Sequence, residues 1–309
     1  MNVLSLFDGI SCARVALDRV GLPVATYFAS EVCPHAIKIA QRNHPDTHQL
    51  GDVKRLGVET PLPDVKIDLL VGGSPCVDLS IAKANRKGLD GERSGLFWEY
   101  VRVLRVVNPT WFILENVASM PKKDRDIITK EMGVEPLAIN ASLVSAQSRN
   151  RLFWTNIPVV SLPVDRNIVL KDILQPDAEV DERMTVKGKA FCLTATYAGA
   201  TEANSVARKQ RTMVKVGHIG TTDGQANRVY STEGKSATLS ALGGGGGAKT
   251  GLYAVDVRIR KLTPIECERL QGLPDDYTEG VAKTNRYKCL GNAFNVDVVA
   301  HILSAIPKV

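Results

Sequence analysis

The sequence predicts an α/β protein, in which a mostly parallel sheet with helices on both faces is joined to a small, irregular, β-rich domain. Short apolar runs alternate with helical patterns through the first 155 residues, which is the signature of α/β architecture. Residues 67–71 and 111–114 are almost continuously apolar, as in strands buried on both faces. After about Pro158 the chain is rich in Pro, Gly, Thr and Ser, and five consecutive glycines at 243–247 disfavour regular structure.

The elements follow in order along the chain. Residues 3–7 form an apolar run ending in Asp8-Gly9, typical of a strand and a turn, and residues 13–20 have helical spacing that stops at Gly21. Further strands are predicted at 24–30, 67–71, 111–114 and 151–155, and further helices at 34–43, 96–107, 264–270 and 293–306. A short β-like run is predicted at 190–197. We therefore expect one domain from residues 1–158 and 258–309, with a second domain, residues 159–257, inserted into it.

Composition and charge exclude several classes of protein. With 44% hydrophobic and 23% charged residues, the 309-residue chain has the composition of an ordinary globular protein. It has neither an apolar run of about 20 residues nor the features of a signal peptide, so we expect a cytoplasmic protein without a membrane span. None of its six cysteines forms a C-x-x-C pair, so we expect no metal site. Residues 183–253 hold ten Lys or Arg against three acids, a net +7 in a chain of net +6, which indicates an anionic partner for that segment.

The segment between the first strand and helix has the features of a cofactor loop. In Phe7-Asp8-Gly9-Ile10-Ser11-Cys12, the glycine permits close approach of backbone to a ligand, and the helix that follows favours an anionic group. Glu31, at the end of the second strand, lies where an acid usually binds ribose hydroxyls, and Asp52 could accept a bond from an adenine amino group. These features indicate an adenosine-bearing cofactor. The alternative is a plain tight turn with two solvated acids.

A reactive cysteine is predicted directly after the buried strand at 67–71. Gly72-Gly73-Ser74-Pro75-Cys76 places a thiol beyond the carboxyl end of a strand, where ligand sites of α/β sheets lie, and a thiolate there suits a soft carbon electrophile. Glu115 follows the next buried strand and could act as a general acid, whereas its alternative is a helix cap or structural acceptor. Arg149 and Arg151, two apart on a strand, would point to the same face, although alone they also fit an exposed charged strand.

The loop after Cys76 is basic and rich in glycine. Lys83 and Arg86 lie in it, and it fits a lid over a nucleic-acid backbone or a solvated loop.

Taken together, these motifs resemble the DNA (cytosine-5)-methyltransferases over residues 1–155 and 258–309. The matching segments, in the family's order, are Phe7-Asp8-Gly9, Glu31, Gly51-Asp52-Val53, Gly73-Ser74-Pro75-Cys76, Glu115-Asn116-Val117, Gln147-Ser148-Arg149-Asn150-Arg151, Arg260-Lys261-Leu262-Thr263-Pro264, Glu268-Arg269-Leu270-Gln271-Gly272-Leu273-Pro274 and Gly291-Asn292-Ala293. The first motifs are more similar to those of the animal de novo enzymes than to those of the usual bacterial ones. The short chain is similar to bacterial or phage enzymes. Ser11 replaces the second glycine of the family's first motif.

The resemblance implies a Rossmann-like, S-adenosylmethionine-dependent methyltransferase fold with a target-recognition domain at 159–257. It implies that Cys76 attacks cytosine C6, Glu115 bonds the N3 edge, Arg149 holds O2 and Arg151 braces the site. The implied cofactor pocket comprises Phe7, Asp8, Gly9, Ile10, Ser11, Cys12, Glu31, Val32, Asp52, Val53, Pro75, Leu96, Asn292, Ala293 and Phe294. The candidate DNA contacts are Ser80, Lys83, Arg86, Arg183, Arg208, Lys209, Arg211, Arg228 and Lys249.

The expected partner is double-stranded DNA, and a cognate restriction endonuclease is compatible with the resemblance. Two alternatives stay open, an RNA cytosine-5 methyltransferase and a catalytically silent DNA-binding protein. The sequence after Pro75-Cys76, Val77-Asp78, differs from the RNA-acting branch, and the intact Cys76, Glu115, Arg149 and Arg151 argue against a silent protein. The recognition sequence and the oligomeric state are not predicted.

Overall fold

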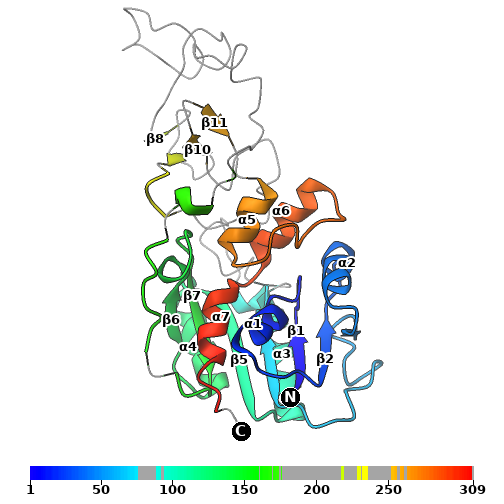
Figure 1. Ribbon diagram of the computed structural model, residues 1–309. Coiled ribbons are helices and arrows are strands. Elements are labelled where there is room, and N and C mark those ends of the chain that lie inside the picture. Colours follow the sequence, from blue (N-terminus) through cyan, green and yellow to red (C-terminus); the bar gives the residue numbers. More distant parts are fainter. Residues whose placement is uncertain are drawn as a thin grey trace, which may run out of the picture.

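The computed structural model shows an α/β body and a smaller second sheet (Figure 1). It describes residues 1–75, 88–91, 94–159, 161–168, 170–173, 175, 217–218, 228–230, 232–235, 252–255, 258–260 and 263–307. Among these residues, no helix is both long and apolar enough to cross a lipid bilayer.

The main sheet has seven strands in the order β3-β2-β1-β4-β5-β7-β6. The strands are β1 (Asn2–Leu6), β2 (Thr26–Ser30), β3 (His48–Gln49), β4 (Leu69–Gly72), β5 (Trp111–Val117), β6 (Leu137–Asn140) and β7 (Asn150–Thr155). All neighbours pair in parallel except β7, which is antiparallel to both β5 and β6. The chain runs outward from β1 through β2 to β3 and then returns to β4 on the other side of β1. The crevice between β1 and β4 is therefore the topological switch point, where open α/β sheets bind ligands.

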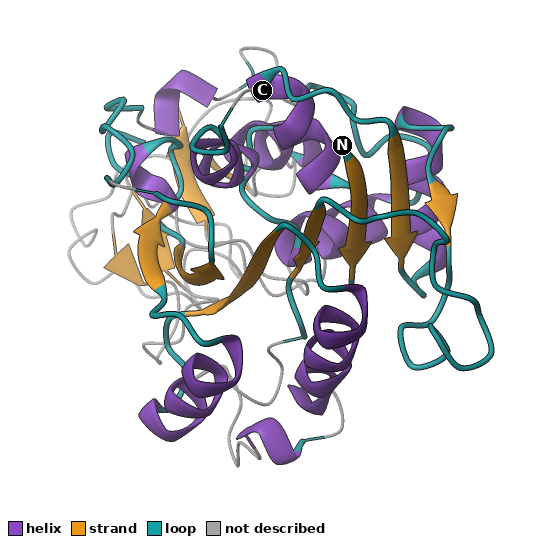
Figure 2. Cartoon of the chain, turned by 90° about the horizontal axis from the view of Figure 1, so that it is seen from below, coloured by secondary structure: helices purple, strands orange, loops and turns teal. Residues whose placement is uncertain are grey.

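Helices cover both faces of this sheet, as Figure 2 shows along the row of strands. The helices are α1 (Cys12–Val20), α2 (Pro34–Asn43), α3 (Phe97–Val107), α4 (Lys122–Met132), α5 (Pro264–Leu270), α6 (Lys283–Asn292) and α7 (Val296–Leu303). Successive residues of a strand point to opposite faces, so Leu69 and Val71 join one core with α1 and α7, whereas Leu70 joins another with α3 and α4. The predicted fold class is confirmed, a Rossmann-like sheet with a helical layer on each side.

Several boundaries differ from the sequence-based predictions. β5 continues to Val117, so Glu115 lies within the strand rather than beyond it. The predicted helix at 293–306 is only α7, because Ala293 has extended backbone and the Asn295 side chain caps α7 by accepting from the Val298 amide. Within the α/β body, the helices and strands that were not predicted are α4, α6, β3 and β6. α4 was missed because it is mostly charged, with only Asp124, Ile128 and Met132 buried.

The second sheet contains four short strands in the order β11-β10-β9-β8. They are β8 (Gly217–His218), β9 (Arg228–Tyr230), β10 (Leu252–Val255) and β11 (Arg258–Arg260). Figure 1 shows α5 and α6 between this sheet and the α/β body. β11 pairs with β10, so the second sheet extends past the predicted boundary at residue 257. The β-like run at 190–197 and the glycines at 243–247 lie outside the described residues.

Candidate active site

The β1–α1 loop, residues 7–11, is the first component of the site and is called the cofactor loop below. Three of its residues have positive φ, Phe7 at 55°, Gly9 at 62° and Ser11 at 59°. This left-handed conformation is strained for the two non-glycine residues. Such a sequence of dihedrals turns the chain sharply from β1 into α1, and it requires neighbouring side chains that hold it.

Asp8 supplies the strongest of these restraints. Its buried carboxylate accepts hydrogen bonds from the Tyr27 hydroxyl at 2.8 Å and from the Ser11 hydroxyl at 2.6 Å. Burial raises the pKa of Asp8, and the three hydroxyl groups of Ser11, Ser5 and Tyr27 oppose that rise. The Ser11 side chain thus has a local partner that a glycine would lack, which explains how serine is accommodated at the left-handed position preceding α1.

Glu31 ties the end of β2 to the cofactor loop. Its carboxylate accepts from the backbone amides of Gly9 at 2.8 Å, Val32 at 2.7 Å and Cys33 at 2.8 Å. The next side chain, Val32, is 65% exposed, so an apolar surface adjoins the carboxylate. An acid beside an exposed apolar residue, next to the cofactor loop, offers both polar and apolar contacts to a nucleoside.

Asp52 and Val53 follow β3, which is parallel to β2, so they lie at the same edge of the sheet as Glu31. The Asp52 carboxylate accepts from the Lys54 amide at 3.0 Å, which forms a local turn, and Val53 is buried. The Ser30 hydroxyl donates to the Gly51 carbonyl at 2.7 Å. This bond holds the segment against the end of β2, beside Glu31.

The chain approaches the site closely where β4 ends, because Gly72 ends the strand and Gly73 begins the loop after it. A Cβ on Gly72 would lie 2.7 Å from the Leu6 carbonyl oxygen, and one on Gly73 would lie 2.7 Å from the Phe294 ring and 3.0 Å from Glu115 Oε2. Asn116 holds the loop by donating to the Ser74 hydroxyl at 3.1 Å. The Ser94 hydroxyl donates to the Pro75 carbonyl at 3.1 Å. Backbone and side chains from four segments therefore converge directly before Cys76.

Glu115, Arg149 and Arg151 lie together at the ends of β5 and β7. Glu115 Oε1 and Arg151 Nε form an ion pair at 2.8 Å, with the two side chains 13% and 14% exposed. Arg149 is buried, and its guanidinium donates to the Ala293 carbonyl at 2.9 Å and the Gly291 carbonyl at 3.3 Å. The three side chains line a small cavity of about 10 Å³, close to the volume one water requires. Arg151 also lines an open pocket of about 360 Å³ with Ala118, Ser119, Ser148 and Asn150.

The remaining predicted pocket residues come from two other segments. Leu96 is half-buried at the end of a 3-10 turn, Ser94–Leu96, that precedes α3. Asn292 is exposed at the end of α6, whereas Ala293 is buried and Phe294 lies against Gly73. The Phe294 backbone also lies near the Cys12 thiol, so the C-terminal segment approaches the start of α1.

Three of the described cysteines are unsuited to nucleophilic chemistry. Burial raises the pKa of Cys289 to about 12 and raises the pKa values of Cys12 and Cys267 further. Since the thiolate is the reactive form, these three residues act as small apolar groups at neutral pH.

Several predicted residues lie outside the described part of the chain. They are Cys76, Ser80, Lys83, Arg86, Arg183, Arg208, Lys209, Arg211 and Lys249; Arg228 lies in β9, but its side chain is not described. Sequence reasoning assigned no role to Tyr27 or to Asn116, which hold the two loops. Asn116 adjoins Glu115 in the sequence, so its position was a usable signal, whereas nothing in the sequence links Tyr27 to Asp8.

The chain matches the sequence profile of the family described as "C-5 cytosine-specific DNA methylase" over residues 1–308. The chain belongs to this family. It is therefore a DNA (cytosine-5)-methyltransferase, and its methyl donor is S-adenosylmethionine.

Individual relatives agree with this family assignment. The chain is 30% identical to the type II methyltransferase M.HhaI of Haemophilus parahaemolyticus, with 98% of this chain and 93% of that protein aligned. It is 24% identical to the orphan methyltransferase M.SPRI of Bacillus phage SPR, over 99% of this chain and 97% of that protein.

Solved structures of other methyltransferases share the fold. The Entamoeba histolytica methyltransferase EhMeth aligns with a TM-score of 0.69 at 14% identity, over 99% of this chain and 97% of that one. The S. pombe Dnmt2 methyltransferase aligns with a TM-score of 0.64 at 17% identity, over 98% of this chain and 97% of that one.

Proposed function

We propose that this enzyme flips a cytosine out of duplex DNA and methylates its C5 in a fixed sequence context, through a covalent bond between Cys76 and C6. The observation that carries the proposal is the ion pair of Glu115 and Arg151 with the buried Arg149, at the strand ends beside the loop that leads to Cys76. A base inside a duplex is inaccessible to such a site, so the cytosine must leave the stack.

The cofactor loop and its neighbours fit S-adenosylmethionine. We assign residues 8–12 to its methionine end, Glu31 to its ribose, and Val32, Asp52 and Val53 to its adenine. Exposed Val32 can pack on the adenine, and the Glu31 carboxylate is bonded to the cofactor loop through the Gly9 amide. Pro75, Leu96, Asn292, Ala293 and Phe294 would complete the pocket. The bound cofactor would supply the methyl group that cytosine C5 accepts.

The chain's own residues would carry the other steps. When the Cys76 thiolate forms a bond to C6, the electron pair of the C5–C6 double bond shifts to C4–C5, and the C4–N3 pair moves onto N3. Glu115 bonds the N3 and amino edge of the base, which stabilises the charge that develops there. After C5 has taken the methyl group, loss of the C5 proton and departure of Cys76 restore the double bond.

The arginine contacts favour exchanging the roles that the sequence suggested. Arg149 already donates to the carbonyls of Gly291 and Ala293, so we assign it to bracing the C-terminal segment. Arg151 lies between Glu115 and the open pocket of about 360 Å³, so we assign it to the base oxygen O2.

DNA recognition is assigned to residues 159–257 and to the basic loop after Cys76. The net positive charge of residues 183–253 would neutralise phosphates, and side chains there would read base edges. The candidate contacts are Ser80, Lys83, Arg86, Arg183, Arg208, Lys209, Arg211, Arg228 and Lys249. Because its relatives include bacterial and phage enzymes, we propose that it acts in the bacterial cytoplasm, alone or with a restriction endonuclease.

The test is base-resolution mapping of 5-methylcytosine in DNA from a methylation-free bacterial host that expresses the chain or its Cys76→Ala variant. We expect methylation in one sequence context, and its loss in the variant. DNA containing 5-fluorocytosine should trap wild type, but not Cys76→Ser, as a covalent adduct. Methylation of RNA instead of DNA, or binding without an adduct, would overturn the proposal.

A further inference from the structure

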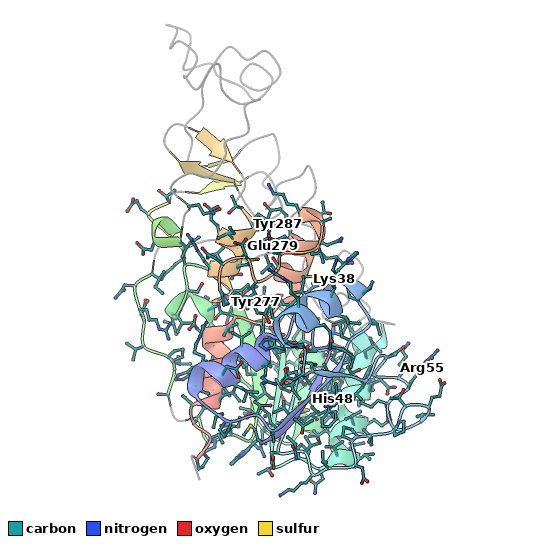
Figure 3. The ribbon with its side chains drawn as sticks, turned by 45° about the vertical axis from the view of Figure 1, so that its right-hand side comes forward. Lys38, His48, Arg55, Tyr277, Glu279 and Tyr287 are labelled. Atoms are coloured by element: carbon teal, nitrogen blue, oxygen red, sulfur yellow. The ribbon has the colours of Figure 1, made fainter. Side chains whose placement is uncertain are left out.

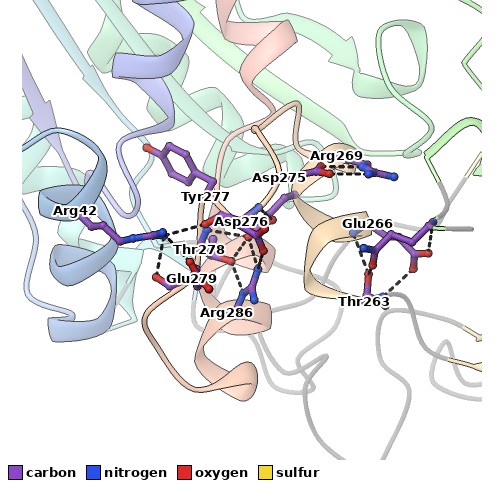
Figure 4. A network of polar contacts seen from close by, with 12 residues as sticks. Arg42, Thr263, Glu266, Arg269, Asp275, Asp276, Tyr277, Thr278, Glu279 and Arg286 are labelled. Atoms are coloured by element: carbon purple, nitrogen blue, oxygen red, sulfur yellow. Dashed lines mark hydrogen bonds and ion pairs between the residues drawn. The ribbon is translucent and has the colours of Figure 1, made fainter. Parts of the chain in front are cut away.

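The turn between α5 and α6, residues 275–279, is held rigidly from the α5 side (Figure 4). Glu268, fully buried in α5, accepts from the backbone amides of Asp276 and Thr278, both at 2.8 Å. Arg286 of α6 pairs with the same carboxylate at 2.8 Å. A buried carboxylate with this many donors fixes the backbone of the turn.

The same turn is also bound from α2. Arg42 donates to the Asp276 carbonyl at 2.9 Å and pairs with the Glu279 carboxylate at 2.8 Å. Asn43 donates to the Tyr277 carbonyl at 2.9 Å. The backbone of Tyr277 is thus restrained from two elements that are far apart in the sequence.

The Tyr277 side chain points from this turn to the cofactor loop. Figure 3 shows Tyr277 inside the molecule beside α1 and α2, and its side chain is only 5% exposed. Its hydroxyl donates to the Ile10 carbonyl oxygen at 2.8 Å, across 267 residues of sequence. His44 Nε2 lies 3.2 Å from the same hydroxyl. Because the hydroxyl has one proton and gives it to Ile10, the His44 nitrogen is the donor in the second bond.

Ile10 lies at the centre of the strained part of the cofactor loop. Gly9 and Ser11, on either side of it, both have left-handed backbone. The Asp8 amide donates to the Ser30 carbonyl at 3.2 Å and the Gly9 amide to Glu31 at 2.8 Å, so β2 restrains the start of the loop. The Tyr277 bond restrains the peptide that follows Ile10, which is the peptide that carries the Ser11 amide.

We propose that Tyr277 is a positioning residue, which presets the cofactor loop for S-adenosylmethionine through its bond to the Ile10 carbonyl. His44 orients the hydroxyl from behind. This inference rests on the proposed assignment of the loop to the methionine end of the cofactor. Loss of the bond leaves the fold intact but loosens the peptide after Ile10, whose Ser11 amide still donates to the Asp8 carbonyl at 3.2 Å. The binding of cofactor must then include the entropy of ordering this peptide.

The test compares Tyr277→Phe with Tyr100→Phe. Tyr100 is a matched control, because its buried hydroxyl, on α3, donates to the Ile113 carbonyl of β5 at 3.0 Å, a contact that does not involve the cofactor loop. Titration calorimetry with S-adenosylhomocysteine, without DNA, should show a dissociation constant raised roughly 3- to 10-fold in Tyr277→Phe, the effect of one hydrogen bond. The KM for S-adenosylmethionine should rise equally, with kcat and the KM for DNA within about twofold of wild type. Tyr100→Phe should leave cofactor affinity unchanged.

A second variant separates positioning from general destabilisation. His44→Phe keeps a ring in place but removes the second partner of the hydroxyl, so we expect a smaller loss of cofactor affinity. The double variant His44→Phe/Tyr277→Phe should bind no more weakly than Tyr277→Phe alone, since His44 acts through the hydroxyl. Equal affinity of wild type and Tyr277→Phe, or additive losses in the double variant, would overturn the inference while the proposed function stands. Failure of wild type to bind S-adenosylhomocysteine would overturn both.

Discussion

A double-mutant cycle on Glu115 and Arg151 tests the central ion pair of the site. The single variants are Glu115→Gln and Arg151→Gln, and the double variant removes both charges. Each single variant leaves one largely buried charge without its partner, whereas the double variant leaves none. We therefore expect the losses of unfolding free energy in the two single variants to add up to more than the loss in the double variant.

The expected coupling follows from the geometry. The two side chains are 13% and 14% exposed and meet at 2.8 Å, so solvent screens them little. A hydrogen bond between charged groups in such surroundings contributes about 1.5–3 kcal/mol, and we expect a coupling in that range. The Arg105–Glu131 pair is the control, because it has the same residue types at 2.6 Å but the arginine is 68% exposed. Its coupling should be about 0.2–1 kcal/mol.

Urea unfolding of each variant at low and high salt measures both couplings. The Glu115–Arg151 coupling should change little with salt, whereas that of Arg105–Glu131 should shrink. Single-turnover methylation by Glu115→Gln should fall by about 10²-fold or more, since the carboxylate is assigned to the developing charge. Additive effects at Glu115 and Arg151, within about 0.5 kcal/mol, would refute the reasoning that the pair is an energetically coupled unit.

Three further predictions follow from burial and charge. Iodoacetamide at pH 8 should alkylate Cys12, Cys267 and Cys289 at least about a hundredfold more slowly in the folded than in the urea-unfolded protein. Peptide mass spectrometry measures these rates, and comparable rates in the two states would contradict the raised pKa values of the three thiols. Because the pKa of Asp8 is raised on folding, its contribution favours the folded state at low pH and is lost as pH rises through the folded value. The thermal midpoint of Asp8→Asn minus that of wild type should therefore increase as the pH rises above 3.8, the ordinary pKa of an aspartate, and then level off. A difference that decreases over this range would contradict the prediction. DNA affinity should fall steeply between roughly 50 and 200 mM salt, and a flat response would argue against a phosphate-dominated interface.

Local sequence signals predicted the bounds of two helices that begin with proline. The predicted bounds 34–43 and 264–270 agree with α2 and α5, where proline opens each helix and, in α5, Thr263 and Glu266 form a reciprocal capping box. β5 was predicted too short because Glu115 and Asn116 are polar, although they continue the ladder with β7. The residue types at this strand end follow from the needs of the site and not from the propensity to form a strand.

The site was only partly accessible to sequence reasoning. Motif spacing indicated Gly9, Glu31 and Glu115, because each follows the end of a predicted strand, and indicated the two arginines, because they lie two apart at the start of one. The partners that hold them are remote in sequence. Arg149 bonds Ala293 across 144 residues, and Tyr277 bonds Ile10 across 267, so no local pattern could reveal either contact. Only the packing of α5, α6 and α7 onto the sheet brings these groups together.

These long-range contacts also explain why a long insertion is compatible with one site. Residues 263–307 return to the α/β body, where Phe294 packs on Gly73 and the Ala293 carbonyl receives Arg149. The described residues that follow β7 still contact the body, since Arg166 pairs with Asp297 at 3.0 Å and Ile173 lies in the core. The segment that can vary therefore lies between residues 175 and 263. Because the entropy cost of closing a loop grows only slowly with its length, this segment can vary without weakening the contacts that shape the cavity. Changes within residues 176–257 should accordingly alter which DNA is recognised and leave the geometry of Glu115, Arg149 and Arg151 as it is.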